Sequence, residues 1–250
     1  MRLASRSQLS FIMLVVTGSA LALLVEKAVA QVPTQRGKEI PPARQEYMGR
    51  RISYTMGVAG APWLIRKNRQ QEEDCASLLK ELRLEPGMTV CDMGCGNGFY
   101  SLKMARLVGT KGRVLAVDIQ RGMLRLLQAR AQESDLANIK AILSTVIDPK
   151  LPKKEVDLIL CVDVYHEFSH PEYMLRAMRE SLSKDGVIAL AEYREEDPTV
   201  PIKPLHKMSK KQILREYRAN GLKLVREFDG LPWQHLMFFA RDEDWVAKSQ

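Results

Sequence analysis

The stretch that decides the fold reads VCDMGCGNGFY and spans residues 90–100. A strand-like apolar run ends there in Asp92. Three glycines follow at alternate positions, namely Gly94, Gly96 and Gly98. The spacing is G-x-G-x-G, whereas a dinucleotide loop has G-x-G-x-x-G, and Phe99 stands where that third glycine would fall. Glycines cost backbone entropy, so the loop predicts a ligand that approaches the backbone closely, and the preceding acid favours a ligand with an ammonium group over a pyrophosphate.

Strand and helix patterns alternate from residue 69 onward. Apolar strands are predicted at 88–92, 112–118, 139–144, 156–163, 187–193, 222–228 and 235–241. Amphipathic helices are predicted at 69–84, 99–108, 120–134, 171–182 and 209–221. This alternation predicts an α/β fold, a Rossmann-like, doubly wound and mostly parallel seven-stranded sheet with helices on both faces. The last two strands have no helix between them and therefore predict an antiparallel edge hairpin.

The composition is that of an ordinary globular protein with one sizeable core. The chain has 250 residues, of which 46% are hydrophobic and 27% charged, and its formal net charge is +8. A basic surface can attract nucleic acid, anionic lipid or acidic substrates. Here the basic residues are interspersed with acids and form no block, which is typical of a solvated surface. No pattern of aromatic and basic residues indicates nucleic-acid binding.

The first thirty residues differ from the rest of the chain. Arg2 and Arg6 precede an apolar run at residues 11–25, and the sequence AVA stands at 28–30. This pattern predicts a secretory signal peptide at 1–30 and export to the periplasm or the extracellular space. The alternative is an uncleaved membrane anchor at 11–25, which would bring the protein close to a membrane, although a spanning helix needs about 20 apolar residues. Cleavage would remove three basic residues and one acid, lowering the formal charge from +8 to +6.

Two further segments are predicted to follow the signal peptide. Residues 31–68 form a linker and an N-terminal cap or lid: 31–43 is polar with three prolines, and glycines break 44–68 into short pieces, a helix and a loop. Residues 69–245 form the main domain. The four cysteines are Cys75, Cys91, Cys95 and Cys161. Their spacing is no metal signature, and we predict no metal site and small buried thiols, with a disulfide left open by the export signal.

A second acidic residue strengthens the prediction of a ligand site. Asp118 ends the predicted second strand, in VLAVD, 26 residues after Asp92. A carboxylate at this place can accept hydrogen bonds from both hydroxyls of a ribose. The alternative for Asp118 is a helix cap.

These motifs resemble those of a known family. VCDMGCGNG is similar to motif I of the class I S-adenosylmethionine (SAM)-dependent methyltransferases, and VLAVD to their motif II. VDLILCVDVYHEF resembles their fourth-strand motif, and LSKDGVIALAEY their fifth-strand block. The resemblance is to the type 11/25 group and covers roughly residues 75 to 241, with four motifs in the right order. It implies SAM as the cofactor and methyl transfer as the activity.

The resemblance also implies roles for single residues. The implied SAM contacts are Asp92, Gly94, Cys95, Gly96, Gly98, Asp118, Ile119 and Cys161. Asp92 would face the amino group of SAM, directly or through water, and the glycine loop would line its methionine part. Asp118 would bind the ribose hydroxyls and Ile119 would pack on the adenine. Cys161 and the residues after it would close the other side of the cofactor.

The sequence departs from the family pattern after the third strand. Relatives often carry an acid there, in G-D-A, near the adenine amine, whereas this chain reads STVIDPKLP. Thr145 stands where the acid is expected, with Val146 beside it and Asp148 three residues later. Either Asp148 takes this role or the backbone holds the adenine. Asp148 is equally suited to a turn before Pro149.

The segment DVYHEF, after the fourth strand, holds the candidates for catalysis. His166 is the first candidate for a general base, because its ordinary pKa is near 6.5, and its alternative is a structural hydrogen bond. Glu167 and Asp163 are weaker candidates, equally able to cap the helix at 171. Further candidates for substrate contact, each with packing as the alternative, are Met48, Met56, Trp63, Arg66, His206, Lys207 and Met208.

The leading interpretation is SAM-dependent methyl transfer to a small-molecule or lipid-like acceptor. One alternative is a non-catalytic SAM-binding protein of the cell envelope. A nicotinamide-dependent oxidoreductase is disfavoured by the glycine spacing. The sequence leaves open the acceptor, the methylated atom, the oligomeric state and the source of SAM outside the cytoplasm.

Overall fold

The computed structural model of the chain describes residues 40–246, and its compact unit begins at Pro42. The predicted signal peptide and the predicted linker up to residue 39 lie outside the described residues, so both stay predictions. Within residues 40–246 no helix is long and apolar enough to cross a membrane.

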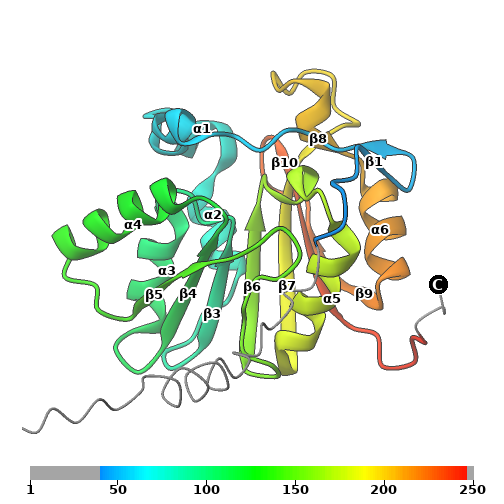
Figure 1. The fold of residues 1–250 in the computed structure, drawn as a ribbon. Coiled ribbons are helices and arrows are strands. Elements are labelled where there is room, and N and C mark those ends of the chain that lie inside the picture. Colours follow the sequence, from blue (N-terminus) through cyan, green and yellow to red (C-terminus); the bar gives the residue numbers. More distant parts are fainter. Residues whose placement is uncertain (1–39, 247–250) are drawn as a thin grey trace, which may run out of the picture. The chain divides into compact units, whose positions relative to one another are not determined.

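A sheet of eight strands forms the centre of the unit (Figure 1). Its main strands are β3 (Thr89–Met93), β4 (Arg113–Asp118), β5 (Ile139–Leu143), β6 (Val156–Val162), β7 (Leu182–Arg194), β9 (Leu222–Phe228) and β10 (Gln234–Arg241). The order is β5-β4-β3-β6-β7-β10-β9, and the two-residue strand β8 (Lys207–Met208) pairs with β7. Strands β3 to β7 pair in parallel, whereas β10 is antiparallel to β7 and β9. The predicted fold class is confirmed, with β8 as an added eighth strand.

The chain reverses its direction across the sheet between β3 and β6. From β3 it proceeds to β4 and β5 on one side, and then returns to β6 on the other side of β3. The loops after β3 and β6 therefore diverge at the carboxyl edge. In open α/β sheets this switch point is where ligands bind.

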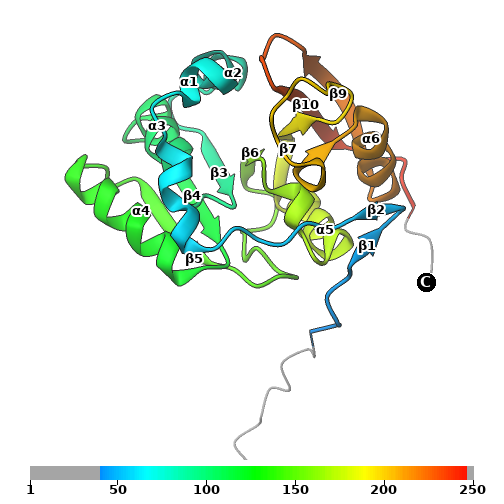
Figure 2. The ribbon, with the colours of Figure 1, turned by 90° about the horizontal axis from the view of Figure 1, so that it is seen from above.

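Helices cover both faces of the sheet (Figure 2). They are α1 (Arg69–Glu73), α2 (Cys75–Glu81), α3 (Phe99–Val108), α4 (Arg121–Glu133), α5 (Pro171–Ser181) and α6 (Lys210–Ala219). Alternate strand residues face alternate layers, as the two-residue repeat of a strand requires. Val90 and Leu158 pack with α2 and α3, whereas Cys91 and Ile159 pack with α5 and α6. Both faces are therefore apolar, which explains the continuous apolar runs of the parallel strands.

Most element boundaries lie within two residues of the sequence predictions, and two differ for physical reasons. The helix predicted at 69–84 is broken at Asp74, which has φ of 45° and whose side chain accepts a hydrogen bond from the Ser77 N–H. Asp74 therefore caps a new helix. Strand β7 begins at Leu182 instead of residue 187, because Leu182 pairs with Val156 of β6.

The N-terminal segment crosses the carboxyl edge of the sheet. It contains a hairpin of β1 (Glu46–Tyr47) and β2 (Arg50–Arg51) and the 3-10 helix η1 (Val58–Ile65), in place of the predicted helix and loop. Asn97 Nδ2 donates to the Ala61 carbonyl at 3.0 Å, and Gln120 Nε2 donates to the Met56 carbonyl at 2.9 Å. These bonds fix η1 over the loops that follow β3 and β4.

All four cysteines are free and buried. They lie at Cys75, Cys91, Cys95 and Cys161. Burial raises the pKa of each thiol above its usual range. The thiols act as small apolar side chains, as predicted, and the structure contains no disulfide among them.

Candidate functional site

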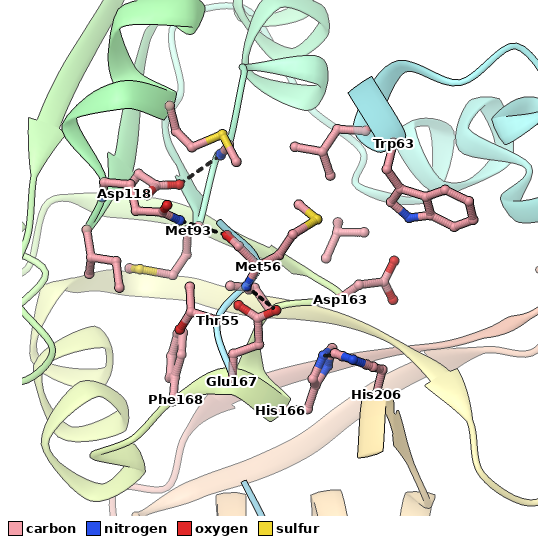
Figure 3. A pocket seen from close by; sticks show the side chains of 18 of the residues that line it. Thr55, Met56, Trp63, Met93, Asp118, Asp163, His166, Glu167, Phe168 and His206 are labelled. Atoms are coloured by element: carbon pink, nitrogen blue, oxygen red, sulfur yellow. Dashed lines mark hydrogen bonds between the residues drawn. The ribbon is translucent and has the colours of Figure 1, made fainter. Parts of the chain in front are cut away.

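A cavity of about 540 Å³ lies at the carboxyl edge of the sheet, where β3, β4 and β6 end (Figure 3). Its walls come from the loops after β3 to β6, from the N-terminal segment, from the end of β7 and from residues 201–206. Two short 3-10 helices, η2 (Tyr165–Glu167) and η3 (Pro204–His206), contribute to one side. The cavity is large enough for a cofactor, and it lies at the switch point of the sheet.

Asp118 lies on one wall of the cavity at the end of β4 (Figure 3). Its Oδ2 accepts a hydrogen bond from the Gly96 N–H at 3.0 Å, and its Oδ1 accepts one from the Gln120 N–H at 2.8 Å. Burial raises the pKa of Asp118, although these backbone donors oppose the shift. Each carboxylate oxygen can accept a second hydrogen bond, so the group can bind two neighbouring hydroxyls.

The glycine loop combines positive φ angles with close approach. Gly94 and Gly96 line the cavity with φ of 67° and 52°. A Cβ on Gly94 would lie 2.3 Å from Val164 Cγ2, and one on Gly96 would lie 2.5 Å from Leu64 Cδ1. Gly98 also has a positive φ but is not a lining residue. Glycine is required here both by conformation and by protein side chains that would meet a Cβ.

Asp92 lies beneath the glycine loop and is not a lining residue of the cavity. Its Oδ2 accepts a hydrogen bond from Ser101 Oγ at 2.5 Å. Burial raises its pKa to about 6, against the effect of the Ser101 bond. The contact of Asp92 with an ammonium group stays a prediction. Cys95 and Cys161 are buried and do not line the cavity either.

The wall predicted for adenine contains Ile119, Thr145 and Val146. Ile119 is 40% exposed, so its apolar surface is available to a flat ligand. Asp148 does not line the cavity; its Oδ1 accepts from the Lys150 N–H at 2.8 Å, and its carbonyl accepts from the Thr145 N–H at 3.0 Å. Asp148 is therefore a turn residue, the second of its two predicted roles. Of the two ways predicted for holding an adenine, the backbone is the one that remains.

A cluster of charged side chains, contributed by α1, the end of β7 and the residue after β6, also lines the cavity. Glu73 accepts hydrogen bonds from Arg69 Nε at 2.8 Å and from Tyr193 Oη at 2.8 Å, and all three residues line the cavity. Asp163 also lines it, with φ of 50°. Asp163 Oδ2 accepts from Gln234 Nε2 at 2.7 Å, whereas the buried Oδ1 has no hydrogen-bond partner within residues 40–246. Burial, followed by the negative charge of Glu73, raises the pKa of Asp163 well above its usual range.

Two histidines and two carboxylates meet at the end of the cavity away from Asp118. His166 Nδ1 lies 2.7 Å from Glu192 Oε2, and the His166 backbone N–H donates to Glu192 Oε1 at 3.1 Å. His166 Nε2 lies 3.0 Å from His206 Nδ1, and Ser53 Oγ lies 3.2 Å from the same His206 nitrogen. Glu167 is beside them and accepts from the backbone N–H of residue 56 at 3.2 Å.

Burial acts differently on the titrating groups of this cluster. For His166 the burial effect lowers the pKa, but the charge and hydrogen bond of Glu192 outweigh it, so the pKa is raised. Burial and then the charge of His166 lower the pKa of His206. Burial raises the pKa of Glu167 to about 7. Glu167 can therefore exchange a proton near neutral pH.

The other predicted contacts divide into those inside and those outside the cavity. Trp63 and Met56 line it, as does His206. Arg66 does not; its guanidinium stacks on Trp63 at 3.8 Å from the ring centre. Lys207 also lies outside and donates to a backbone carbonyl at 3.1 Å. Met48 and Met208 do not line the cavity either.

Sequence reasoning missed Arg69, Glu73 and Tyr193, as well as Glu192. The pair Arg69–Glu73 has the i,i+4 spacing of a helical ion pair, which is common on helix surfaces and does not by itself indicate a site. Glu192 interrupts the apolar strand β7 and is fully buried. An acid inside an apolar strand is a signal of a buried partner and could have indicated this residue.

A family model described as "Methyltransferase domain" matches residues 84–233. The chain is 27% identical over 125 residues to demethylmenaquinone methyltransferase of Listeria welshimeri, covering 49% of this chain and 51% of that protein. It is 27% identical over 106 residues to (S)-coclaurine N-methyltransferase of Thalictrum flavum, covering 42% of this chain and 29% of that protein. The chain thus spans about half or less of the length of these curated relatives.

Among solved structures, a SAM-dependent methyltransferase from Aquifex aeolicus superposes with a TM-score of 0.70 at 24% identity. The match covers 74% of this chain and 98% of that one. This likeness concerns the fold, while the family model covers more than half of the sequence, including the glycine loop and Asp118. The chain belongs to the methyltransferase-domain family and has the fold of the class I SAM-dependent methyltransferases.

Proposed function

We propose that the protein transfers a methyl group from SAM to a small-molecule or lipid-like acceptor. The observation that carries this proposal is the placement of Asp118 beside Gly94 and Gly96 on one wall of the cavity. Its carboxylate is held by backbone N–H groups and retains capacity for two hydroxyls. When bound, SAM supplies a methyl group already activated on a sulfonium centre, so the protein mainly has to position the acceptor.

The polar groups along the cavity fit the two ends of this cofactor. Asp118 would bind the ribose hydroxyls, with Ile119 against the adenine. The buried Oδ1 of Asp163, which lacks a partner within residues 40–246, would accept a hydrogen bond from the ammonium group. Arg69 is positioned to attract the carboxylate of the methionine part. This assignment moves Asp163 from the catalytic candidates to cofactor binding.

The acceptor would occupy the end of the cavity near His166, Glu167 and His206. Apolar side chains of Met56, Trp63 and Phe168 also line the cavity, which suits an acceptor with an apolar body. The curated relatives are named for methylation of demethylmenaquinone and coclaurine, which supports a small-molecule acceptor. His166 as a general base would use Nε2, since Nδ1 is engaged by Glu192.

Calorimetric titration of the purified full chain with SAM tests the cofactor site. We expect micromolar binding that Asp118→Ala weakens at least tenfold. The matched control is Asp157→Ala, because Asp157 also accepts a backbone N–H, that of Thr89 at 2.9 Å, but lies at the opposite end of β6. This control should bind SAM like the wild type.

Two other outcomes separate the alternatives. No SAM binding by protein shown to be folded would refute the proposal, and titration with a nicotinamide dinucleotide would then test the oxidoreductase. SAM binding without methyl transfer to any acceptor in a broad screen would instead favour a non-catalytic SAM-binding protein.

A further inference from the structure

We propose that His166, His206 and Glu167 form a binding site for one divalent transition-metal ion, such as Zn²⁺ or Fe²⁺, at the acceptor end of the cavity. Their ligand atoms, one from each residue, all lie within 4.8 Å of one another. Two imidazoles and one carboxylate are a donor set that such ions prefer, and they leave further coordination positions open. All three residues line the cavity, so an open position can face a ligand there.

The two imidazole nitrogens already have the separation of neighbouring metal ligands. His166 Nε2 and His206 Nδ1 are 3.0 Å apart, and their rings lie side by side in Figure 3. Two metal–nitrogen bonds of about 2.1 Å place the nitrogens about 3.0 Å apart at the right angle of an octahedral site, and about 3.4 Å apart at the angle of a tetrahedral site. The separation is therefore close to that of neighbouring ligands. The ring centres are 5.1 Å apart, so the two nitrogens point toward each other, and both rings would have to turn for their lone pairs to meet on one ion.

Glu192 selects the form of His166 that can bind a metal. The carboxylate lies 2.7 Å from Nδ1 and is fully buried, so Nδ1 carries the hydrogen and donates it. In the neutral ring the lone pair is then on Nε2, the atom that faces His206. A carboxylate that accepts from the second nitrogen of a ligand histidine is a recurrent feature of zinc sites.

One nitrogen of His206 has more polar neighbours than it can satisfy. Its Nδ1 has two neighbours, His166 Nε2 at 3.0 Å and Ser53 Oγ at 3.2 Å. A ring nitrogen carries either one hydrogen or one lone pair and satisfies only one of these neighbours well. A cation beside the two nitrogens, about 2.1 Å from each, would use the lone pairs of both rings. The Ser53 hydroxyl could then act as a further ligand or a donor.

The ion would determine which acceptors the enzyme takes, and this part rests on the proposed function. A Lewis acid at this place favours an acceptor that binds through an oxygen, such as a phenol or an enol. The ion would lower the pKa of that hydroxyl, whose proton leaves to solvent. The oxygen lone pair then forms the bond to the methyl carbon as the carbon–sulfur bond of SAM breaks, leaving a thioether. His166 would act as a metal ligand and not as the general base.

Spectroscopic titration with Co²⁺ and competition with Zn²⁺ test the site on untagged full-length protein after treatment with a chelator. We expect one ion per chain, with visible bands typical of nitrogen and oxygen ligands. His206→Ala and Glu167→Gln should each weaken binding at least tenfold, and Glu192→Gln, which alters only the partner of His166, by about 10–100-fold. Thermal unfolding shows that each variant is folded.

The matched control is His235→Gln. His235 Nε2 also contacts a carboxylate, that of Glu196 at 2.8 Å, but His235 does not line the cavity. Stoichiometric binding retained by this control and lost in His206→Ala supports the site. Absence of binding, or equal binding by His206→Ala and the wild type, overturns it. SAM titration of the same samples is a separate readout, so failure of the metal site and failure of the cofactor site are distinguishable.

Discussion

At the scale of a single residue, the buried carboxyl group of Asp92 makes stability depend on pH. Its folded pKa is raised to about 6, chiefly by burial. A raised carboxyl pKa means that the stabilising effect is fully present below the unfolded pKa of about 3.9 and is lost as the pH rises through about 6. A shift of about two units corresponds to at most about 3 kcal/mol.

Asp92→Asn should remove this part of the pH dependence. The amide oxygen can still accept the hydrogen bond from Ser101, but the group no longer ionises. We expect the free energy of unfolding of the variant, relative to the wild type, to increase between about pH 4 and pH 7. Urea unfolding of both proteins at a series of pH values measures this difference in free energy. Ser101→Ala provides the contrast, because losing its hydrogen bond raises the Asp92 pKa further. Parallel stability curves for wild type and Asp92→Asn would contradict the prediction.

The glycine loop offers a second test at the residue scale. Gly94→Ala should lower the free energy of unfolding by roughly 2–4 kcal/mol, since the left-handed backbone and the clash with Val164 both contribute. The control is Gly87→Ala, which also has a positive φ, 94°, but no atom within 4 Å of the added Cβ. It should show only the backbone cost, about 1–2 kcal/mol. Equal losses for both variants in chemical denaturation would mean that close approach at Gly94 costs nothing.

At the scale of elements, a buried ion pair holds the N-terminal hairpin to α6. Arg50 on β2 donates from Nε and Nη2 to the two carboxylate oxygens of Glu216 at 2.8 and 3.0 Å. Tyr165 Oη donates to Glu216 at 2.6 Å, and Arg50 Nη1 donates to the His166 carbonyl at 3.0 Å. The hairpin therefore connects α6 with the segment that carries His166.

Arg50→Met should destabilise the protein by about 3–5 kcal/mol, because it leaves the fully buried charge of Glu216 without its partner. Arg50→Met combined with Glu216→Gln should recover part of this loss, since no unpaired charge remains. Thermal and chemical unfolding of Arg50→Met, Glu216→Gln and the double variant measure the difference. If the double variant is as unstable as the sum of two independent single losses, the ion pair is not the cause.

Local patterns predicted most elements, and long-range partners explain the exceptions. Helix α3 and strand β9 have the predicted bounds because their apolar repeats are strong and their ends carry turn residues. The hairpin β1–β2 has only two residues in each strand, too few for a repeat. It depends on Glu216, which lies 166 residues after Arg50. No window of sequence contains both residues.

In the candidate site, too, the residues within short motifs could be predicted, whereas those that depend on distant partners could not. Asp118 and the glycine loop could be found because chemistry and local structure share one short motif. The role of Glu73 depends on Tyr193, 120 residues later and on the other half of the sheet. His206 and Glu167 were named singly, but their proximity to each other follows from the docking of η3 beside η2.

At the scale of the whole molecule, the predicted signal peptide has a direct test. We expect cleavage after Ala30 on export, so that the mature chain begins at Gln31. N-terminal sequencing of protein from the envelope or the medium measures this, and Ala30→Phe, which places a bulky residue at the cleavage site, should block processing. An intact N-terminus on cytosolic protein would refute export and would remove the question of how SAM reaches the enzyme.

The four buried thiols have a consequence for the whole molecule. Only a thiolate reacts readily, and burial disfavours that form at every cysteine of the chain. The covalent framework is therefore the same in a reducing and in an oxidising compartment. The folded protein neither gains a crosslink nor loses one when its surroundings change. A thiol reagent would accordingly label only unfolded molecules. The rate of labelling in the living cell would therefore report the rate of unfolding.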